Sequence, residues 1–372
     1  MAFPILSFFT GGGFLDIGFE QAGFEILWTN ENNPSFVTLY SAGMSAWRKS
    51  QKRTAKKARI SNVRDVQELT PALIRQEAFR DTAPKRFGII GGPPCPDFSN
   101  GGVHAGHNGE LGKLTKTFVQ LIGRLQPTFF LIENVAGLYH FHKHRAFLES
   151  QVSLLRNRFG YAVDYTLLNA LTLGVPQHRE RLFVIGCRKQ IAARSVGRRL
   201  RAGDRNWFPW PEVEAYAGAP DLPWPERTQF GGKPAPPKGI PLELTVFPLL
   251  YGKNAPGKLP NGREHFIGYS PTFRERDEGD VTGKSFKRLH RYRFSPTVWY
   301  GNQEVHLHPS EPRRLSVREA LRIQTVPDEY VLPAEEPLSS KFKLIGNAVP
   351  CLMARRVAEA IVSFLALADS RS

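Results

Sequence analysis

Apolar runs alternate with helical patterns from the start of the chain. The apolar stretch "FPILSFF" is followed by the glycine turn "TGGG", by a helical pattern over 14–24 and by the apolar stretch "EILWTN". Asp16 and Glu20 fall on the side of that helix opposite its apolar face. This order predicts strand, turn, helix and strand, which is how a doubly wound α/β unit begins.

The alternation continues toward the middle of the chain. A short strand ends at Ile90, "KLTKTFVQLIGRLQ" has helical spacing, and "TFFLIENV" is an apolar strand that ends on Glu133 and Asn134. Functional side chains of parallel α/β sheets gather at the carboxyl ends of the strands. Cys95 and Glu133 both come just after such an end, although a carboxylate there is also typical of a helix cap or a solvated loop.

A further helix and strand lead to the loop "LGVPQHRER" and the strand "LFVIG". Arg179 and Arg181 enter this strand two residues apart, so their side chains are expected on one face.

The pattern changes after Gly186. Residues 188–312 contain most of the prolines and tryptophans, lack helical periodicity and include basic runs, which predicts a separate, loop-rich, mixed-β domain. Aromatic residues are too frequent there for a disordered linker. Regular structure returns with "RRLSVREALRIQ", where Ser316 and Glu319 have the spacing of a capping box, and a final helix follows "IGNAVP". We therefore predict a first domain over 1–187, a second over 188–312 and a return segment, 313–372, that completes the first.

The net charge of the chain indicates which kind of partner it binds. The 372 residues include 50 Lys and Arg against 34 Asp and Glu, a formal net charge of +16, which favours a polyanionic partner such as nucleic acid. The alternative is that the excess serves only solubility. The basic stretch 47–59 fits either a solvated surface or a phosphate contact.

The cysteines Cys95, Cys187 and Cys351 are few and far apart, so they form neither a disulfide framework nor a zinc pattern. No signal peptide and no membrane-spanning stretch is recognisable. We expect a reduced, cytoplasmic protein without a membrane partner.

Cys95 lies in an unusual loop, "GGPPCPDFSNGG". Two prolines before the thiol fix the backbone, and the surrounding glycines permit turns and close approach of a ligand. Such a loop presents the thiol, whereas the plainer interpretation is a surface loop with a buried cysteine.

Six motifs in their order along the chain resemble the DNA cytosine-5 methyltransferase family, of the bacterial type found in restriction–modification systems. They are "FFTGGGFLDIGFEQAGF", "GGPPCPDFS", "LIENVAGL", "GVPQHRERLFVIG", "RRLSVREALRIQTVPDEY" and "LIGNAVP". The resemblance covers residues 4–188 and 313–365, and 188–312 stands where this family has its target-recognition region. It implies the doubly wound mixed sheet of the S-adenosylmethionine-dependent, Rossmann-like methyltransferases.

The resemblance also implies roles for individual residues. Cys95 matches the nucleophile that adds to C6 of a flipped-out cytosine, and Glu133 matches the acid that contacts the ring. Arg179 and Arg181 match the arginines that hold the nucleotide and the catalytic loop. The residues expected to position the substrate are Pro94, Ser99, Asn134 and Gln177.

For the cofactor, the family pattern implies S-adenosylmethionine, leaving S-adenosylhomocysteine as product, and no metal. The residues expected to bind it are Phe9, Gly11, Gly13, Glu31, Asp65, Pro93 and Asn347. At Ser7, Phe14 and Pro96 this chain has residues other than those that are frequent in the family. The detailed contacts to the cofactor are therefore expected to differ from the family pattern.

The expected function is methylation of cytosine C5 in a short sequence of double-stranded DNA. We expect a monomer in the prokaryotic cytoplasm, associated with the nucleoid, whose cognate restriction endonuclease acts on the same site without direct binding; an orphan methyltransferase has the same sequence features. A transfer RNA methyltransferase of a related branch and a catalytically silent DNA-binding relative are alternatives. A dinucleotide oxidoreductase is disfavoured because the glycine fingerprint is missing.

Overall fold

A computed structural model describes residues 3–51, 58–80, 82, 84–94, 110–201, 203–252, 255–283, 285–297, 300 and 306–371. Its centre is a six-stranded sheet in the order β2-β1-β3-β4-β6-β5. The strands are β1 (Phe3–Phe8), β2 (Phe24–Asn30), β3 (Gly88–Gly91), β4 (Phe129–Val135), β5 (Tyr161–Asn169) and β6 (Glu180–Arg188). Strands β1 to β4 run parallel to one another, whereas β6 runs antiparallel to both β4 and β5.

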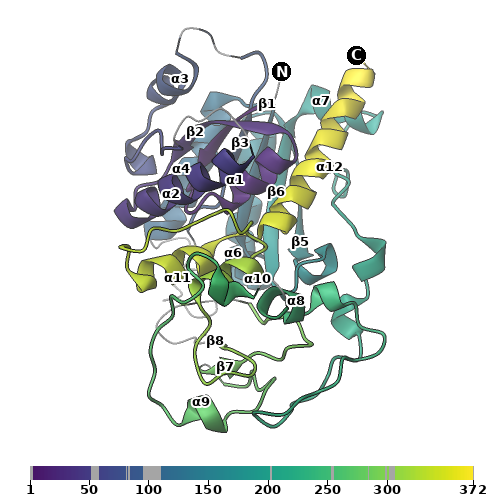
Figure 1. The fold of residues 1–372 in the computed structure, drawn as a ribbon. Helices are drawn as coiled ribbons and strands as arrows, with labels where there is room; N and C mark the ends of the chain where they lie inside the picture. Colours follow the sequence, from purple (N-terminus) through teal and green to yellow (C-terminus); the bar gives the residue numbers. More distant parts are fainter. Residues whose placement is uncertain are drawn as a thin grey trace.

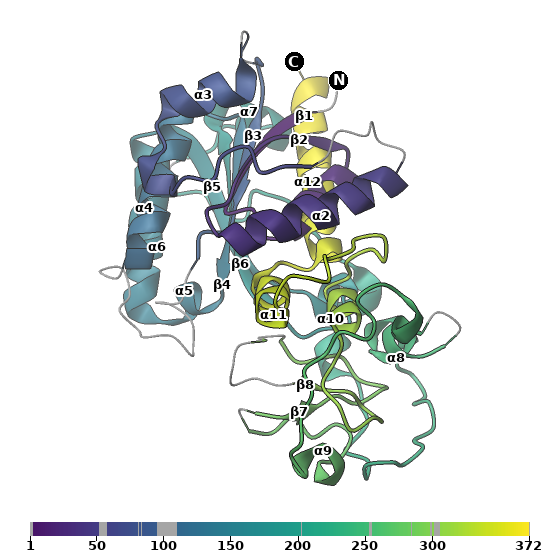
Figure 2. The same ribbon diagram turned by 60° about the vertical axis from the view of Figure 1, so that its left-hand side comes forward.

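Helices cover both faces of the sheet (Figures 1 and 2). The helices of this part are α1 (Phe14–Gln21), α2 (Pro34–Ser50), α3 (Pro71–Phe79), α4 (Glu110–Leu125), α5 (Gly137–His140), α6 (His142–Asn157), α7 (Lys189–Val196) and α12 (Cys351–Ser370). In β4, Phe130 packs into the core shared with α4 and α6, and Leu131 into the core shared with α12. Successive side chains of each strand thus enter opposite cores, which explains why the strands are continuously apolar.

Helix α1 is buried on the side where its acids lie, which the sequence pattern did not indicate. Asp16 is 0 % exposed and accepts a hydrogen bond from Ser7 Oγ at 2.6 Å and from the Tyr40 hydroxyl at 3.4 Å. Glu20 forms an ion pair with Arg48 of α2. Burial raises the pKa of Asp16 to about 7. Arg48 comes from the basic stretch 47–59, so this member of the stretch is engaged inside the protein.

The final helix closes the fold against the first one. As its spacing predicts, α12 buries one apolar side, formed by Met353, Val357, Ile361, Phe364 and Leu365. It crosses α1 at Gly18, where an added Cβ would lie 2.5 Å from the Cβ of Ala354. Only glycine allows this close crossing, so the two ends of the chain share one core.

The region between α7 and residue 313 contains little regular structure, and its elements from α8 to β8 lie beyond the carboxyl ends of the parallel strands (Figure 2). Its described elements are α8 (Phe247–Leu250), α9 (Thr272–Glu275), β7 (Lys287–Arg288), β8 (His306–Leu307) and the 3-10 turns Glu214–Tyr216, Ala219–Asp221, Leu242–Leu244 and Pro256–Lys258. Before them, Trp207 and Phe208 still pack on Phe364 of α12. The domain limits at 188 and 312 stay predictions.

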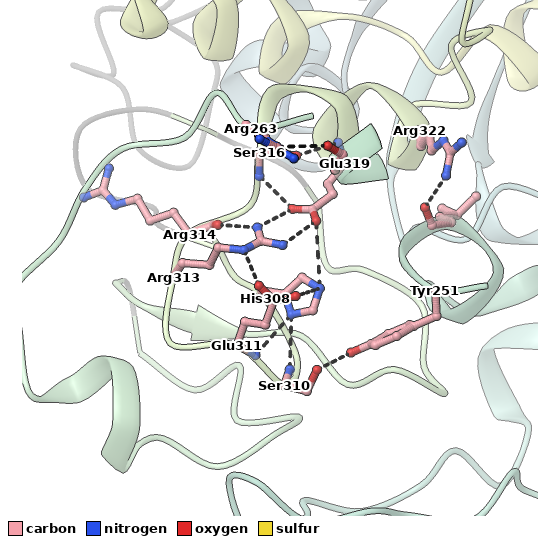
Figure 3. Close-up of polar contacts among 12 residues, drawn as sticks. Tyr251, Arg263, His308, Ser310, Glu311, Arg313, Arg314, Ser316, Glu319 and Arg322 are labelled. Carbon is pink, nitrogen blue, oxygen red and sulfur yellow. Dashed lines mark hydrogen bonds and ion pairs between the residues drawn. The ribbon is translucent and has the colours of Figure 1, made fainter. Parts of the chain in front are cut away.

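A polar cluster fastens this region to α10 (Val317–Ile323), as Figure 3 shows. Ser316 and Glu319 form the predicted capping box, which is confirmed. The Arg313 guanidinium donates to both carboxylate oxygens of Glu319, at 2.7 and 2.8 Å, and buried His308 faces the same carboxylate. Helix α11 (Leu338–Asn347) lies beside α10, between the sheet and the loop-rich region (Figures 1 and 2).

Within the described ranges, no helix is both long and apolar enough to cross a membrane.

Candidate active site

Glu133 lies at the carboxyl end of β4 and faces Arg181 of β6. In the antiparallel register, Glu133 is opposite Phe183 and Val135 is opposite Arg181, so the side chains at 133 and 181 are diagonal neighbours on one face. Arg181 Nε lies 3.0 Å from Glu133 Oε1. Glu133 is 8 % exposed. The strand pairing itself therefore positions this acid–arginine pair at the carboxyl end of β4.

Burial and nearby positive charge act on Glu133 in opposite directions. Burial raises the pKa of the Glu133 carboxyl, and Arg181 and Arg179 partly oppose this increase. The net direction is upward, so Glu133 retains a proton to higher pH than an exposed glutamate does. Such a carboxyl suits hydrogen bonding to a ring that carries both a donor and an acceptor.

Arg179, two residues before Arg181 in the chain, is held by hydrogen bonds to a backbone carbonyl and to a side-chain oxygen. It is 0 % exposed, donates to the Gly346 carbonyl at 2.8 Å and to Gln177 Oε1 at 3.4 Å. Asn347, the next residue after Gly346, ends α11 and is exposed. Asn347 and Arg179 therefore lie close together. The family resemblance gives Asn347 a role in cofactor binding and Arg179 a role in DNA binding.

The chain leaving β3 passes directly against Glu133. An added Cβ at Gly92 would lie 2.8 Å from Glu133 Oε2, so the glycine leaves room for the carboxylate. Asn134 Nδ2 donates to the Pro93 carbonyl at 3.4 Å. Pro94 follows and is exposed. Cys95 and Ser99 lie outside the described residues, and the described part of their loop begins beside the acid.

The first turn and the end of β2 form a second group of predicted residues. Phe9, Gly11 and Gly13 all have positive φ, of 52°, 55° and 77°, which makes the turn after β1 tight. Glu31 Oε2 accepts from the Gly11 N–H and Oε1 from the Asn33 N–H, both at 2.9 Å. These bonds fix the orientation of a carboxylate that is 9 % exposed and whose pKa is raised by burial.

Asp65 is close to this group without joining it directly. It caps the 3-10 turn Val66–Glu68 and accepts from Asn32 Nδ2 at 3.2 Å, one residue beyond Glu31. The Phe9 ring meets the edge of Phe118, with centroids 5.4 Å apart. The predicted cofactor residues therefore line the ends of β1 and β2, except for Pro93 beside Glu133 and Asn347 beside Arg179.

Two polar residues of this site were not predicted from the sequence. The Tyr330 hydroxyl donates to the Gly12 carbonyl at 2.8 Å, and Gln324 hydrogen-bonds to Gln177. The only signal for Gln324 in the sequence is weak: it is a polar residue that follows the apolar helix pattern beginning at the capping box.

Comparison with known proteins agrees with the motifs. The family described as C-5 cytosine-specific DNA methylase matches residues 3–214 and 258–363. The chain is 39 % identical to the Type II methyltransferase M.NmeDI of Neisseria meningitidis serogroup C, over 97 % of this chain and 84 % of that protein. It is 29 % identical to the Type II methyltransferase M.FnuDI of Fusobacterium nucleatum, over 96 % of this chain and 93 % of the relative.

Solved structures show the same fold at low identity. The S. pombe Dnmt2 methyltransferase has a TM-score of 0.57 at 13 % identity, covering 98 % of each chain. The Entamoeba histolytica methyltransferase EhMeth has a TM-score of 0.56 at 13 % identity and the same coverage. The predicted fold, a mixed α/β methyltransferase sheet, is confirmed. The chain belongs to the C-5 cytosine-specific DNA methylases, enzymes that methylate cytosine C5 in specific DNA sequences with S-adenosylmethionine as methyl donor.

Proposed function

We propose that this chain, acting as a monomer, methylates one cytosine of a short duplex sequence through a covalent adduct between Cys95 and cytosine C6. The observation that carries the proposal is the Glu133–Arg181 pair at the end of β4, tied by Asn134 to Pro93 at the start of the Cys95 loop. The similarity to Type II methyltransferases supports a role in a restriction–modification system, with a cognate endonuclease that acts on the same site.

Each step of the proposed reaction uses side chains at or after the carboxyl ends of β3 and β4. The Cys95 thiolate forms a bond to C6, and the ring electrons move toward C5, which becomes nucleophilic. Glu133 hydrogen-bonds to N3 and the exocyclic amine and stabilises the charge that develops on the ring. When bound, S-adenosylmethionine supplies the methyl group that C5 accepts. Loss of the C5 proton to a base then restores the ring double bond and expels the thiolate.

The arginines orient these groups rather than react. Arg181 holds the Glu133 carboxyl through a charge-assisted contact at 3.0 Å, and Arg179 is anchored on Gly346. Arg179 is fully buried, whereas the Arg181 side chain is 12 % exposed, so Arg181 is the arginine that can present positive charge to a phosphate of the flipped nucleotide.

The residues at the ends of β1 and β2 fit an adenosyl cofactor. The fixed Glu31 carboxylate keeps acceptor capacity for ribose hydroxyls beyond its two backbone bonds, and Asp65 offers an acceptor for the adenine amine. The turn containing Phe9, Gly11 and Gly13 lets the cofactor approach the backbone, because glycine adds no side chain there. We assign Pro93 and Asn347 to the reacting side of the same pocket; the leaving product is S-adenosylhomocysteine, and no metal takes part.

A transfer assay tests the proposed function. The purified chain is incubated with labelled S-adenosylmethionine and either duplex DNA or transfer RNA, and bisulfite sequencing locates the methylated base. We expect label in DNA only, at one cytosine of a short recurring sequence. Label in transfer RNA, or DNA binding without transfer, would instead support one of the two alternatives raised by the sequence.

Replacing Glu31 by alanine is expected to weaken S-adenosylmethionine binding about tenfold or more, because charge-assisted bonds to the ribose are lost. Titration calorimetry measures the change, and circular dichroism verifies the fold. The control is Glu68→Ala, which removes an exposed acid from the neighbouring 3-10 turn and should leave the affinity unchanged. Equal affinities for Glu31→Ala and the unmodified chain would place the ribose contact elsewhere.

We assign base recognition to residues 188–312. Its elements from α8 to β8 lie beyond the carboxyl ends of the parallel strands (Figure 2). The Glu133–Arg181 pair lies at the carboxyl end of β4. The region 188–312 is fastened to the active-site loop, because the His178 N–H donates to the Ser295 carbonyl at 2.9 Å and the Thr297 hydroxyl to the His178 carbonyl at 2.8 Å. A loop-rich surface with a basic composition suits both phosphate contacts and readout of base edges.

Transplanting residues 188–312 into a related catalytic core of different specificity is expected to transfer the methylated sequence. Bisulfite sequencing of plasmid DNA from cells that express the chimera reads the outcome. A control chimera carries only 110–157, the segment from α4 to α6, and should keep the specificity of its host. If the 188–312 chimera is active and still methylates the host sequence, recognition belongs to another part of the chain.

A further inference from the structure

Gln324 is a buried amide all of whose polar groups are engaged. It is the C-cap of α10, directly after Ile323, and is 0 % exposed. Its backbone N–H bonds to Ala320, and its backbone carbonyl accepts from the N–H of Cys351, the first residue of α12. Its side chain reaches two further segments, so one residue joins four parts of the chain.

The Gln324 amide holds the turn that presents Asn347. The last carbonyls of a helix have no partner within it and need donors from elsewhere. Gln324 Nε2 donates to the carbonyls of Ile345, at 2.6 Å, and Ala348, at 3.3 Å, while Arg179 donates to the carbonyl between them, Gly346, at 2.8 Å. Gln324 and Arg179 together thus bind three of the four carbonyls of the segment 345–348.

The other end of the same amide reaches the DNA side of the site. Gln324 Oε1 accepts from Gln177 Nε2 at 3.2 Å, and Gln177 Oε1 accepts from Arg179 at 3.4 Å. Gln177 is itself 0 % exposed and forms a bridge with Ser295 of the proposed recognition region. A closed ring of hydrogen bonds thus connects Gln324, Gln177, Arg179 and the 345–348 carbonyls. Because Gln324, Gln177 and Arg179 are fully buried, breaking one of the bonds between them leaves polar atoms unpaired.

We propose that Gln324 is a positioning residue that couples cofactor binding to DNA binding. The inference rests on the proposed function, in which Asn347 faces the cofactor and Arg179 the flipped nucleotide. A cofactor that orders Asn347 also fixes the carbonyls on which Gln324 and Arg179 are anchored, so Arg179 and Gln177 are prepared for DNA. Linkage requires the same factor in reverse, with DNA tightening the cofactor.

The experiment measures binding, so it does not depend on turnover. Affinity for a duplex containing the methylated sequence is determined by fluorescence anisotropy with and without S-adenosylhomocysteine, and cofactor affinity by calorimetry with and without the duplex. For the unmodified chain we expect each ligand to tighten the other by about fivefold or more. Gln324→Met keeps the length of the side chain and removes the amide, and should reduce this factor to about twofold or less.

A second variant and a control separate coupling from stability. Gln324→Glu keeps the acceptor for Gln177 but loses the donor to Ile345 and Ala348, and is also expected to lose the coupling. Asn261→Leu removes another buried amide, which bonds Leu332 at 2.8 and 3.0 Å, and should keep the coupling factor of the unmodified chain.

The possible results are distinct. A chain that methylates DNA but shows no coupling, or Gln324 variants that retain it, would overturn the inference and leave the proposed function intact. Loss of coupling in Asn261→Leu as well would overturn it too, because the effect then follows stability. A chain with no methyl transfer to DNA would overturn the proposed function and, with it, the inference.

Discussion

Cys95→Ser is expected to abolish methyl transfer, with a loss of roughly 10³-fold or more, because an alkoxide forms far less readily than a thiolate near neutral pH. The other two cysteines cannot replace it. Cys187 and Cys351 are 0 % and 1 % exposed, and burial raises the pKa of both thiols, that of Cys187 to about 12. Steady-state transfer of labelled methyl groups measures the loss. Cys351→Ala is the control and should stay active if it folds.

A duplex with 5-fluorocytosine at the target position tests the covalent step directly. After methyl transfer the C5 fluorine cannot leave as a cation, so the bond between C6 and the Cys95 sulfur should persist as a protein–DNA adduct. The adduct should require S-adenosylmethionine, map to Cys95 by peptide analysis and be missing in Cys95→Ser. An adduct on Cys187 or Cys351, or full activity of the serine variant, would refute the proposed mechanism.

Glu133→Gln is expected to slow adduct formation by about 10²- to 10⁴-fold, the usual contribution of a positioned acid or base. The amide keeps the shape of the side chain, but it loses the ionisable proton and the charge-assisted contact with Arg181. Because Glu133 lies apart from the Glu31 group, cofactor affinity should change little. Rapid-quench kinetics and calorimetry measure the two quantities.

Glu180→Gln is a matched control for that substitution. Glu180 is the neighbour of Arg179 and Arg181 in the chain, but its side chain is 43 % exposed. Its Oε2 lies 3.7 Å from His140 Nε2. The control should form the adduct at the normal rate. If Glu133→Gln matched it in rate, or lost cofactor binding to the same extent as transfer, the acid would have a structural role only.

Features that depend on near neighbours in the sequence could be predicted. The capping box needs Ser316 and Glu319 only three residues apart, and the strands of the sheet are apolar because both of their faces are covered. The ends of these strands indicated Cys95 and Glu133, and the family resemblance added Arg179 and Arg181 to the same site. The structure places Glu133 and the two arginines together at the carboxyl end of β4.

Features that depend on distant partners could not be predicted in this way. Asp16 and Glu20 are on the polar side of α1 by pattern, yet they are buried because Tyr40 and Arg48 of α2 supply partners there. Gln324 looks like an ordinary residue at a helix end, and its importance is visible only once Gln177 and Ile345 surround it. Helical periodicity describes one element and contains no information about which second element covers it.

The crossing of α1 and α12 determines when a growing chain can finish folding. The Tyr330 hydroxyl binds the Gly12 carbonyl across 318 residues, and α12 covers α1 from still farther along the sequence. Contacts of such separation form late, and during synthesis the amino-terminal strands leave the ribosome long before their cover exists. The apolar side of α1 therefore gains its cover only when the last helix emerges. We therefore expect a chain that ends before α12 to leave this apolar side uncovered and to be cleaved by proteases more readily than the full chain.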